Sequence, residues 1–361
     1  MAYSTIKDPS AHFQTALYAG NNTTDHNITN DGNSDLQPDL VWIKQRTSDN
    51  PHVLQDTSRG FNGSGLAFNL QTNSTAVEGT NGAFESFNTN GFGVGGTNVA
   101  SGAYNLSGSN YVAWQWKANG GTTASNTDGD LTSTVQFNST AGFSIVTYTG
   151  IDPIEPLQVG HGMGEAPDVI IIKNRSSARL WAVYHKELTS PAANRYLQLN
   201  TSTYGELANS TLWGNVAPSS TIITTGENAA VNQPNENLVA YCWKERQGFS
   251  KFGKYVGNGN ANGTFVYTGF KPAFVLWRII SSSGDWRMVD TKRGVNGAIP
   301  RIKPNASSAE GSAGDNVDLL SNGFKFRSTA ASANASGASY IYMAFAENPF
   351  VTSTGIPTTA R

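Results

Sequence analysis

The sequence predicts an all-β fold made of three tandem homologous β-sandwich modules, and two observations lead to this class. The first is an apolar run that begins at a proline and occurs three times, at residues 38–44, 167–173 and 272–278. The second is the composition of the 361-residue chain, which has 38 Gly, 17 Phe, 13 Tyr and 8 Trp but only 14% charged residues. Short β-branched and aromatic runs between Gly, Asn, Ser and Thr clusters are typical of strands and turns.

The repeated unit is a whole module, because landmarks far apart within it recur at matching offsets. The prolines that open the three runs are 129 and 105 residues apart, and the asparagines Asn73, Asn200 and Asn305 are 127 and 105 residues apart. A unit of roughly 100 residues can bury its own core, unlike the roughly 20–50-residue units of solenoids and propellers. About seven short strands per unit favour a sandwich.

These offsets divide the chain into six segments. The junction between the second and third modules is short, so we expect it to be tight, whereas the Gly/Ser/Thr-rich linker between the first and second should flex. The N-terminal arm carries Tyr3, Ile6 and Phe13, which have no obvious place in the first module's core, so we expect the arm to dock onto a neighbouring chain. The segments are the arm (1–14), the first module (15–118), the linker (119–140), the second module (141–247), the third module (248–350) and a C-terminal tail (351–361).

The strand that closes each module is apolar on both faces. We expect the face with the larger side chains to form the sandwich core, and Trp243 to be buried there. The opposite face is too apolar for solvent, so a neighbouring module or a loop should cover it. The larger face carries Val112, Trp114 and Trp116, then Val239, Tyr241 and Trp243, then Ile341, Met343 and Phe345; the opposite face carries Tyr111 and Ala113, then Leu238, Ala240 and Cys242, then Tyr340, Tyr342 and Ala344.

Charge and hydropathy exclude several classes of partner. The 24 Lys and Arg residues are balanced by 26 Asp and Glu residues, and no basic stripe is present, so nucleic acid is not an expected ligand. No apolar stretch approaches the roughly 18 residues needed to span a bilayer, and the N-terminus lacks the pattern of a signal peptide. We therefore expect no membrane insertion and folding in the cytoplasm. The single cysteine, Cys242, is interpreted as a buried, inert thiol.

The sequence contains no recognisable catalytic constellation. The five histidines are scattered without metal-ligand spacing, and no acid-x-acid pair lies on a predicted strand, as a glycosidase would favour. The glycine-rich stretches are not followed by helices, so they are interpreted as turns and not as phosphate-binding loops. We therefore expect no enzymatic activity, no metal and no cofactor.

One repeated pair is a candidate for ligand binding. Asp56 and Arg59 in the first module match Asp290 and Arg293 in the third, while the second module has His185 at the acid's position. An acid and an arginine at a strand exit can bind a polar ligand, or they can form a structural ion pair that fixes the loop. We favour the structural interpretation and keep the four residues as candidate ligand-binding residues.

Aromatic side chains supply the other candidates. Tyr204 and Trp213 lie in a loop-like segment and are candidate exposed, ligand-binding aromatics. Trp181 and Trp286 share a register and could stack on sugars, although core or rim packing is the favoured interpretation.

Four segments of the chain are distinctive: KDPSAHFQTALYAG (7–20), QPDLVWIK (37–44), YVAWQWK (111–117) and YMAFAENPF (342–350). They resemble a group of largely uncharacterised structural proteins of marine tailed, podovirus-like bacteriophages. The resemblance covers essentially the whole chain but carries no defined catalytic or binding residue. It implies a virion component assembled in the host cytoplasm: a tail fibre, a head fibre or knob, or a capsid decoration. The modules also look like concanavalin-like jelly rolls.

These observations favour a non-enzymatic virion structural protein whose modules act as docking or spacer units. Its expected partners are other capsid or tail proteins and further copies of itself, since three modules could match a threefold or sixfold environment. The alternative is a lectin-like adhesion protein that binds a host-surface glycan or receptor for host attachment. A polysaccharide depolymerase ranks third and would require a groove with two converging carboxylates.

Overall fold

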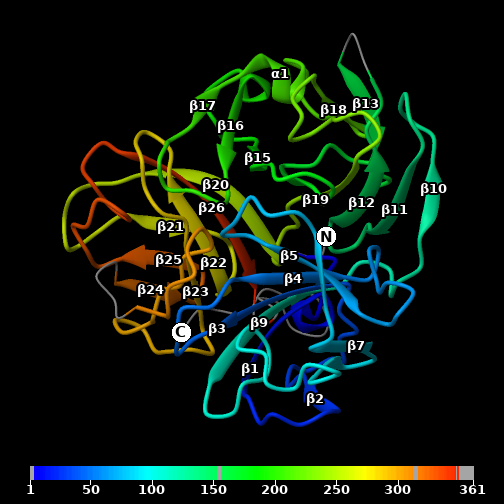
Figure 1. Cartoon of the computed structure of the whole chain (residues 1–361). Helices are drawn as coiled ribbons and strands as arrows, with labels where there is room; N and C mark the ends of the chain where they lie inside the picture. The colour runs from blue at the N-terminus through cyan, green and yellow to red at the C-terminus, as the bar shows by residue number, and fades with distance from the viewer. Residues whose placement is uncertain (1–3, 153–155, 312–315, 347, 349–361) are drawn as a thin grey trace.

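The computed structural model describes residues 4–152, 156–311, 316–346 and 348, and it confirms the all-β prediction with several antiparallel sheets. Within these residues the helical segments are one α-helical turn, α1 (Ser210–Trp213), and the 3-10 turns Pro9–Ala11 and Ala192–Asn194. Figure 1 shows the three repeats as three lobes around a common centre, coloured blue to cyan, green, and yellow to red.

The first repeat forms a large and a small sheet. Its strands are β1 (Phe13–Ala19), β2 (His26–Thr29), β3 (Leu40–Gln45), β4 (Val53–Asp56), β5 (Ala67–Gln71), β6 (Gly79–Asn81), β7 (Phe84–Asn88), β8 (Gly91–Val94) and β9 (Asn110–Trp116). The large sheet has the order β1-β9-β3-β4-β5-β6, and the small sheet has the order β2-β8-β7.

The second repeat has a large sheet with two more strands than that of the first. Its strands are β10 (Ala124–Asn126), β11 (Ser133–Asn138), β12 (Phe143–Thr149), β13 (Leu157–Gly160), β14 (Val169–Asn174), β15 (Trp181–His185), β16 (Arg195–Gln198), β17 (Leu207–Ala208), β18 (Ile222–Thr225) and β19 (Asn237–Trp243). The large sheet has the order β10-β11-β12-β19-β14-β15-β16-β17, and the small sheet pairs β13 with β18.

The third repeat has the smallest large sheet. Its strands are β20 (Ser250–Val256), β21 (Phe265–Tyr267), β22 (Pro272–Ile279), β23 (Arg287–Asp290), β24 (Val317–Leu320), β25 (Gly323–Phe326) and β26 (Ser339–Ala346). The large sheet has the order β20-β26-β22-β23, and the small sheet has the order β21-β25-β24.

The three large sheets share one central topology, in which the closing strand lies between the first strand and the proline-led strand of its repeat. The registers also match. Residues that the sequence offsets make equivalent face each other across these strands: Trp42 and Trp114, Ile171 and Tyr241, and Leu276 and Met343.

The prediction of which face forms the sandwich core is wrong for the first two repeats. Tyr111 and Ala113 share a hydrophobic cluster with Phe92 of the small sheet, and Cys242 shares one with Val159. The smaller-residue face therefore packs on the small sheet. The tryptophan face instead enters a central cluster with residues from all three repeats. A thin sandwich accommodates small side chains, whereas the centre of three converging sheets has room for indole rings.

The central cluster is aromatic and joins the repeats directly. Trp116 lies 6.3 Å from Trp243, 5.7 Å from Phe345 and 6.0 Å from Phe274, all in edge-to-face geometry between ring centroids. Such pairs each contribute about 0.5–1.5 kcal/mol beyond the area that they bury. The three repeats thus share a central core, in addition to the clusters between the two sheets of the first and second repeats.

The N-terminal arm also belongs to this shared core. Ile6 and Phe13 are each 2% exposed, and the Phe13 ring stacks on Phe345 with 5.2 Å between centroids. The expectation that these apolar side chains are free to dock onto another chain is therefore wrong; Tyr3 lies outside the described residues. Phe13 opens β1 opposite Trp116, so the arm places an aromatic ring between the first and third repeats.

Replacing Phe13 with leucine is expected to lower the free energy of unfolding by about 1 kcal/mol, because the volume is nearly kept while the aromatic contacts are lost. Chemical denaturation measures this change. As a control, Leu17→Ala in the same strand should change stability by less than about 0.5 kcal/mol, since Leu17 is 40% exposed. Equal effects of the two substitutions would contradict the placement of Phe13.

The predicted flexible linker is largely structured. β10 and β11 lie within residues 119–140 and extend the second large sheet, because β11 pairs with β12. Where the chain leaves the first repeat, Asp39 accepts hydrogen bonds from the backbone N–H groups of Ala118, Gly120 and Gly121 at 2.7–2.9 Å. The polar composition of residues 119–140 gave no sign of β10 and β11. The buried Asp39 carboxylate holds the junction in place. Residues 351–361 lie outside the described part of the chain.

Candidate functional site

A buried ion pair lies where β4 leaves the first large sheet. Asp56, the last residue of β4, accepts hydrogen bonds from the backbone N–H and the Nε of Arg59. Both side chains are fully buried. Tyr241, on β19 of the second repeat, donates its hydroxyl to Asp56 Oδ2 at 2.7 Å. Burial opposes the charged guanidinium, but Asp56 and its neighbours outweigh it and raise the pKa of Arg59.

The matching pair at the end of β23 makes the same kind of contact. Arg293 Nε lies 2.6 Å from Asp290 Oδ2, and both side chains are fully buried. Trp114, from the first repeat, donates its indole N–H to the same carboxylate oxygen at 3.0 Å, and the guanidinium lies 5.6 Å from the Trp114 ring centroid. The two Asp–Arg pairs therefore link repeats and leave no surface for a ligand, as the structural interpretation predicts.

His185 completes the set in the second repeat. Its Nε2 donates to the Tyr342 carbonyl of the third repeat at 3.2 Å, and its Nδ1 accepts from the Glu187 N–H at 3.2 Å. These partners require the neutral ring protonated on Nε2. Burial lowers the pKa of His185 to about 3. The end of each equivalent strand thus contacts the closing strand of another repeat: first to second, second to third, and third to first.

A second set of contacts joins the repeats in the same cyclic order. The residues involved recur at the sequence offsets of the repeats, so the sequence alone could have indicated them. The glutamates Glu78, Glu206 and Glu310 are 128 and 104 residues apart, close to the repeat offsets. The backbone N–H of each donates to a carbonyl of another repeat at 2.9 Å: Arg175, Ile280 and Arg46, respectively. Two of these glutamates also bind arginines on both sides: Glu78 binds Arg59 and Arg175, and Glu310 binds Arg293 and Arg46. Glu206 instead accepts from Thr189.

The neutral His185 makes stability depend on pH. The unfolded chain takes up a proton at the ordinary value of about 6.5, while the folded chain resists it until about pH 3. The contribution of His185 is therefore complete above pH 6.5 and is lost as the pH falls toward 3, with a slope of up to about 1.4 kcal/mol per unit. In chemical denaturation between pH 7 and 4, His185→Gln should lose stability less steeply. An unchanged slope would contradict this assignment.

The repeated Pro-Asp motif is broken in the third repeat, and a pocket lies there. Asp39 holds the chain that leaves the first repeat, and Asp168 accepts from the Glu245 N–H at 2.9 Å where the chain leaves the second. The equivalent residue in the third repeat is Ala273, which lines a pocket of about 120 Å³ between the first and third repeats.

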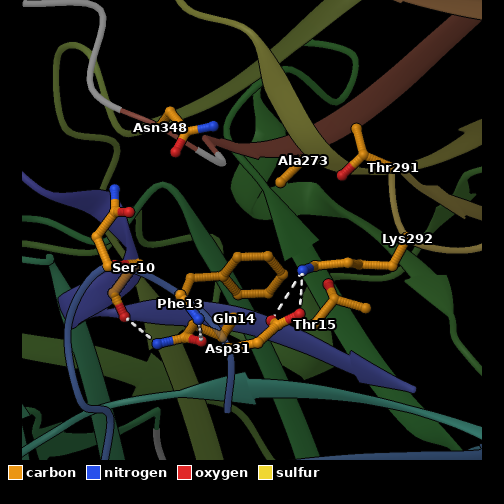
Figure 2. A pocket seen from close by; sticks show the side chains of 11 residues that line it. Ser10, Phe13, Gln14, Thr15, Asp31, Ala273, Thr291, Lys292 and Asn348 are labelled. Atoms are coloured by element: carbon orange, nitrogen blue, oxygen red, sulfur yellow. Dashed lines mark hydrogen bonds and ion pairs between the residues drawn. The ribbon is translucent and has the colours of Figure 1, made fainter.

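The pocket is polar but has no catalytic geometry (Figure 2). Lys292 points at Asp31, and its Nζ lies 2.8 Å from both carboxylate oxygens. Gln14, beside them, donates to the Ser10 carbonyl at 2.9 Å and accepts from the Gly32 N–H at 2.9 Å. The charged groups are paired with each other, so this site can take water or a small polar group but offers no activated nucleophile.

The aromatic candidates separate into one exposed and three buried side chains. Tyr204 is 49% exposed, as expected. Trp213 is only 2% exposed and donates its indole N–H to the Arg195 carbonyl at 3.0 Å, so its predicted exposure is wrong. Trp181 and Trp286 are also buried, and each donates to a carbonyl of the preceding repeat. Packing between repeats, the favoured interpretation, therefore applies to this pair.

Other sites that carry chemistry are closed or absent in the described part of the chain. Cys242 is free and fully buried, which confirms its predicted burial, and burial raises the pKa of its thiol. Among residues 4–152, 156–311, 316–346 and 348, no three His, Cys, Asp or Glu side chains gather where they could hold a metal ion. The helices of those residues are all too short to cross a membrane.

The chain matches a known family model. A family model described as a domain of unknown function, DUF7483, matches residues 8–349, which include all three repeats. No curated protein matches the chain. A single family model therefore spans the three lobes, their junctions and the interfaces described above.

Proposed function

We propose that this chain, which belongs to the DUF7483 family of domains of unknown function, is a non-enzymatic structural component of a bacteriophage particle. Its partners are then capsid or tail proteins and other copies of itself, and its place is the assembled virion. The resemblance of residues 7–20, 37–44, 111–117 and 342–350 to phage structural proteins suggests the particle. The arrangement of the repeats supports the structural role.

The observation that carries the proposal is the closed cycle of contacts between repeats. Three ionisable side chains that could act in catalysis, those of Asp56, Asp290 and His185, instead form these contacts and are at most 1% exposed. An enzyme keeps such groups at a substrate-accessible site with a matched pKa. A particle component needs rigidity without metal or disulfide support, and a shared core supplies it.

Covalent linkage adds to this rigidity. Three separate chains would dissociate on dilution, whereas tethered repeats meet at a high effective concentration whatever the protein concentration. The large sheets of the repeats differ in their outer strands, so one chain can present three different surfaces around the common centre. Such a unit suits a position where a symmetric shell or tail meets an asymmetric neighbour.

The glycan-binding alternative gains less support from the same residues. A sugar platform needs exposed aromatics close to free polar groups. Trp181, Trp213 and Trp286 are buried, and Tyr204 alone of the aromatic candidates is exposed. The depolymerase alternative requires two converging carboxylates, and the pocket carries only Asp31, already paired with Lys292.

Purified particles test the proposal. The protein should co-purify with particles through a density gradient at a fixed copy number, measured by quantitative mass spectrometry, and its density should be found in a whole-particle reconstruction. The isolated protein should release no reducing sugar from host surface polysaccharide. Absence from purified particles, or catalytic turnover of polysaccharide, would overturn the proposal.

A further inference from the structure

The small sheet of the third repeat has an open, apolar edge. β21 is its outer strand and pairs only with β25 in the described residues. Phe265 and Tyr267 are 42% and 59% exposed, and Val256, whose carbonyl accepts from Thr264, is 53% exposed. This group of Val256, Phe265 and Tyr267 is called the β21 edge below.

The backbone of β21 is free to accept another strand. Thr264 accepts from the Phe326 N–H, and Thr268 donates to the Asn322 carbonyl. Because alternate residues of an antiparallel strand bond to its neighbour, the N–H and C=O groups of Phe265 and Tyr267 point away from β25. They form an unpaired ladder on the outer side of the sheet.

The second repeat shows which kind of segment fits at this edge. In that repeat, the equivalent strand β13 is covered by another part of the same chain. Val159 of β13 corresponds to Val266 of β21, since each faces inward nine residues after the glycine that ends the preceding strand, Gly150 or Gly257. Next to Val159, the Gln158 carbonyl accepts from the Asp130 N–H at 2.9 Å. The Gln158 N–H in turn donates to the Asp130 carboxylate at 2.9 Å.

Each position of the covering segment, residues 129–131, requires a particular type of residue. Leu131 forms a parallel bridge with Val159 and joins the apolar cluster of the second repeat. A side chain at Gly129 would collide with the Gln158 carbonyl, at 2.3 Å from the added Cβ. The segment reads glycine, acid, aliphatic, with bends at residues 128–130. The acid binds an edge N–H, and the aliphatic residue covers the inward valine.

Among residues 248–311, 316–346 and 348, no segment of the third repeat covers β21 in this way. The cover in the second repeat comes from the long connection before β12, whereas only residues 244–249 connect β19 to β20. The C-terminal residues 349–361 contain no acid. The open edge of β20 carries Lys251 and Lys254, which discourage strand pairing, but the outward positions of β21 itself are aromatic. Lys325, opposite Phe265 on β25, favours an acidic segment.

We propose that the β21 edge binds a Gly-Asp-Leu-like segment of a partner protein, which adds to the small sheet as residues 129–131 add to β13. The acid accepts from the Phe265 N–H and its own N–H donates to the Phe265 carbonyl, while the aliphatic side chain packs beside Val266. Phe265 and Tyr267 are exposed in the free chain and are covered in the complex. This site does not depend on the particle assignment.

A labelled peptide with the sequence of residues 127–134, TDGDLTST, tests the proposal by fluorescence anisotropy with the full chain. Saturable binding is expected at peptide concentrations up to about 2 mM. Phe265→Pro removes the edge N–H without removing a β25 hydrogen bond and should weaken binding at least tenfold. Tyr267→Lys, which leaves the backbone intact, should also weaken it. A peptide with asparagine and serine in place of the Asp130 and Leu131 equivalents should bind at least tenfold more weakly.

The first repeat supplies matched controls. Asn27 and Thr29 occupy the positions of Phe265 and Tyr267 on β2, opposite Gly93 and Gly91. Asn27→Pro and Thr29→Lys should leave peptide binding unchanged. No saturable binding, or equal binding by the Phe265 and Asn27 variants, would overturn the proposal. If the chain dimerises and Phe265→Pro abolishes the dimer, the edge binds a second copy of the chain. If the chain binds a glycan and Tyr267→Lys abolishes that binding, the edge binds a sugar. Either result would overturn the proposal.

Discussion

Asp290→Ala is expected to lower the free energy of unfolding by about 3–5 kcal/mol. The substitution removes the fully buried carboxylate partner of Arg293, whose guanidinium keeps only the longer ion pair with Glu310 at 3.4 Å among the described residues. It also removes the acceptor of the Trp114 indole N–H. A buried charge without its partner is far more costly than the loss of a surface pair. Denaturant unfolding followed by tryptophan fluorescence measures the change.

Asp31→Ala is the matched control. Asp31 forms an ion pair with Lys292 at 2.8 Å and also joins the first and third repeats, but its side chain is 70% exposed. Its removal should cost about 0–1 kcal/mol. The double substitution Asp290→Leu with Arg293→Met should recover much of the loss, because a well-packed apolar pair can replace a buried ion pair. A loss below about 1 kcal/mol for Asp290→Ala would contradict the buried network.

Trp243→Ala is expected to cost about 3–5 kcal/mol. Trp243 is 5% exposed, which confirms its predicted burial, and it stacks on Phe143 at 5.1 Å and meets Trp116 of the first repeat at 6.3 Å. The substitution opens a cavity in the core that all three repeats share. Tyr204→Ala, at a half-exposed aromatic, should stay within about 0.5 kcal/mol. Equal stability of the two variants would refute the central cluster.

The sequence predicted the all-β class and the central strands of each repeat, because the repeated offsets carry that information three times. It predicted about seven strands per repeat, whereas in the described residues the first repeat has nine and the second ten. It could not assign the faces of the closing strands. Trp114 and Ala113 are both fully buried, and a strand covered on both sides has no polar face that would indicate which layer lies where. The prediction for the N-terminal arm was wrong for a related reason. Phe13 stacks on Phe345 of β26, which is more than 300 residues away in the chain.

For the candidate site residues too, the sequence did not indicate contacts between distant parts of the chain. The offsets correctly made Asp56 equivalent to Asp290, and the structural interpretation of both pairs agrees with their burial. Their partners, Tyr241 and Trp114, belong to other repeats, and no local pattern names them. Trp213 was expected in an exposed loop, but it lies on the single turn α1 and packs at 5.9 Å from Tyr184. Gly and Asn around it suggested a loop and gave no sign of this turn.

Differential scanning calorimetry of the intact chain tests most directly whether three repeats close around one shared core. One cooperative transition is predicted, with calorimetric and van't Hoff enthalpies that agree, and Asp290→Ala should shift the whole transition to lower temperature. Separate transitions, or a calorimetric enthalpy about three times the van't Hoff value, would mean that the repeats unfold independently and would contradict the shared core.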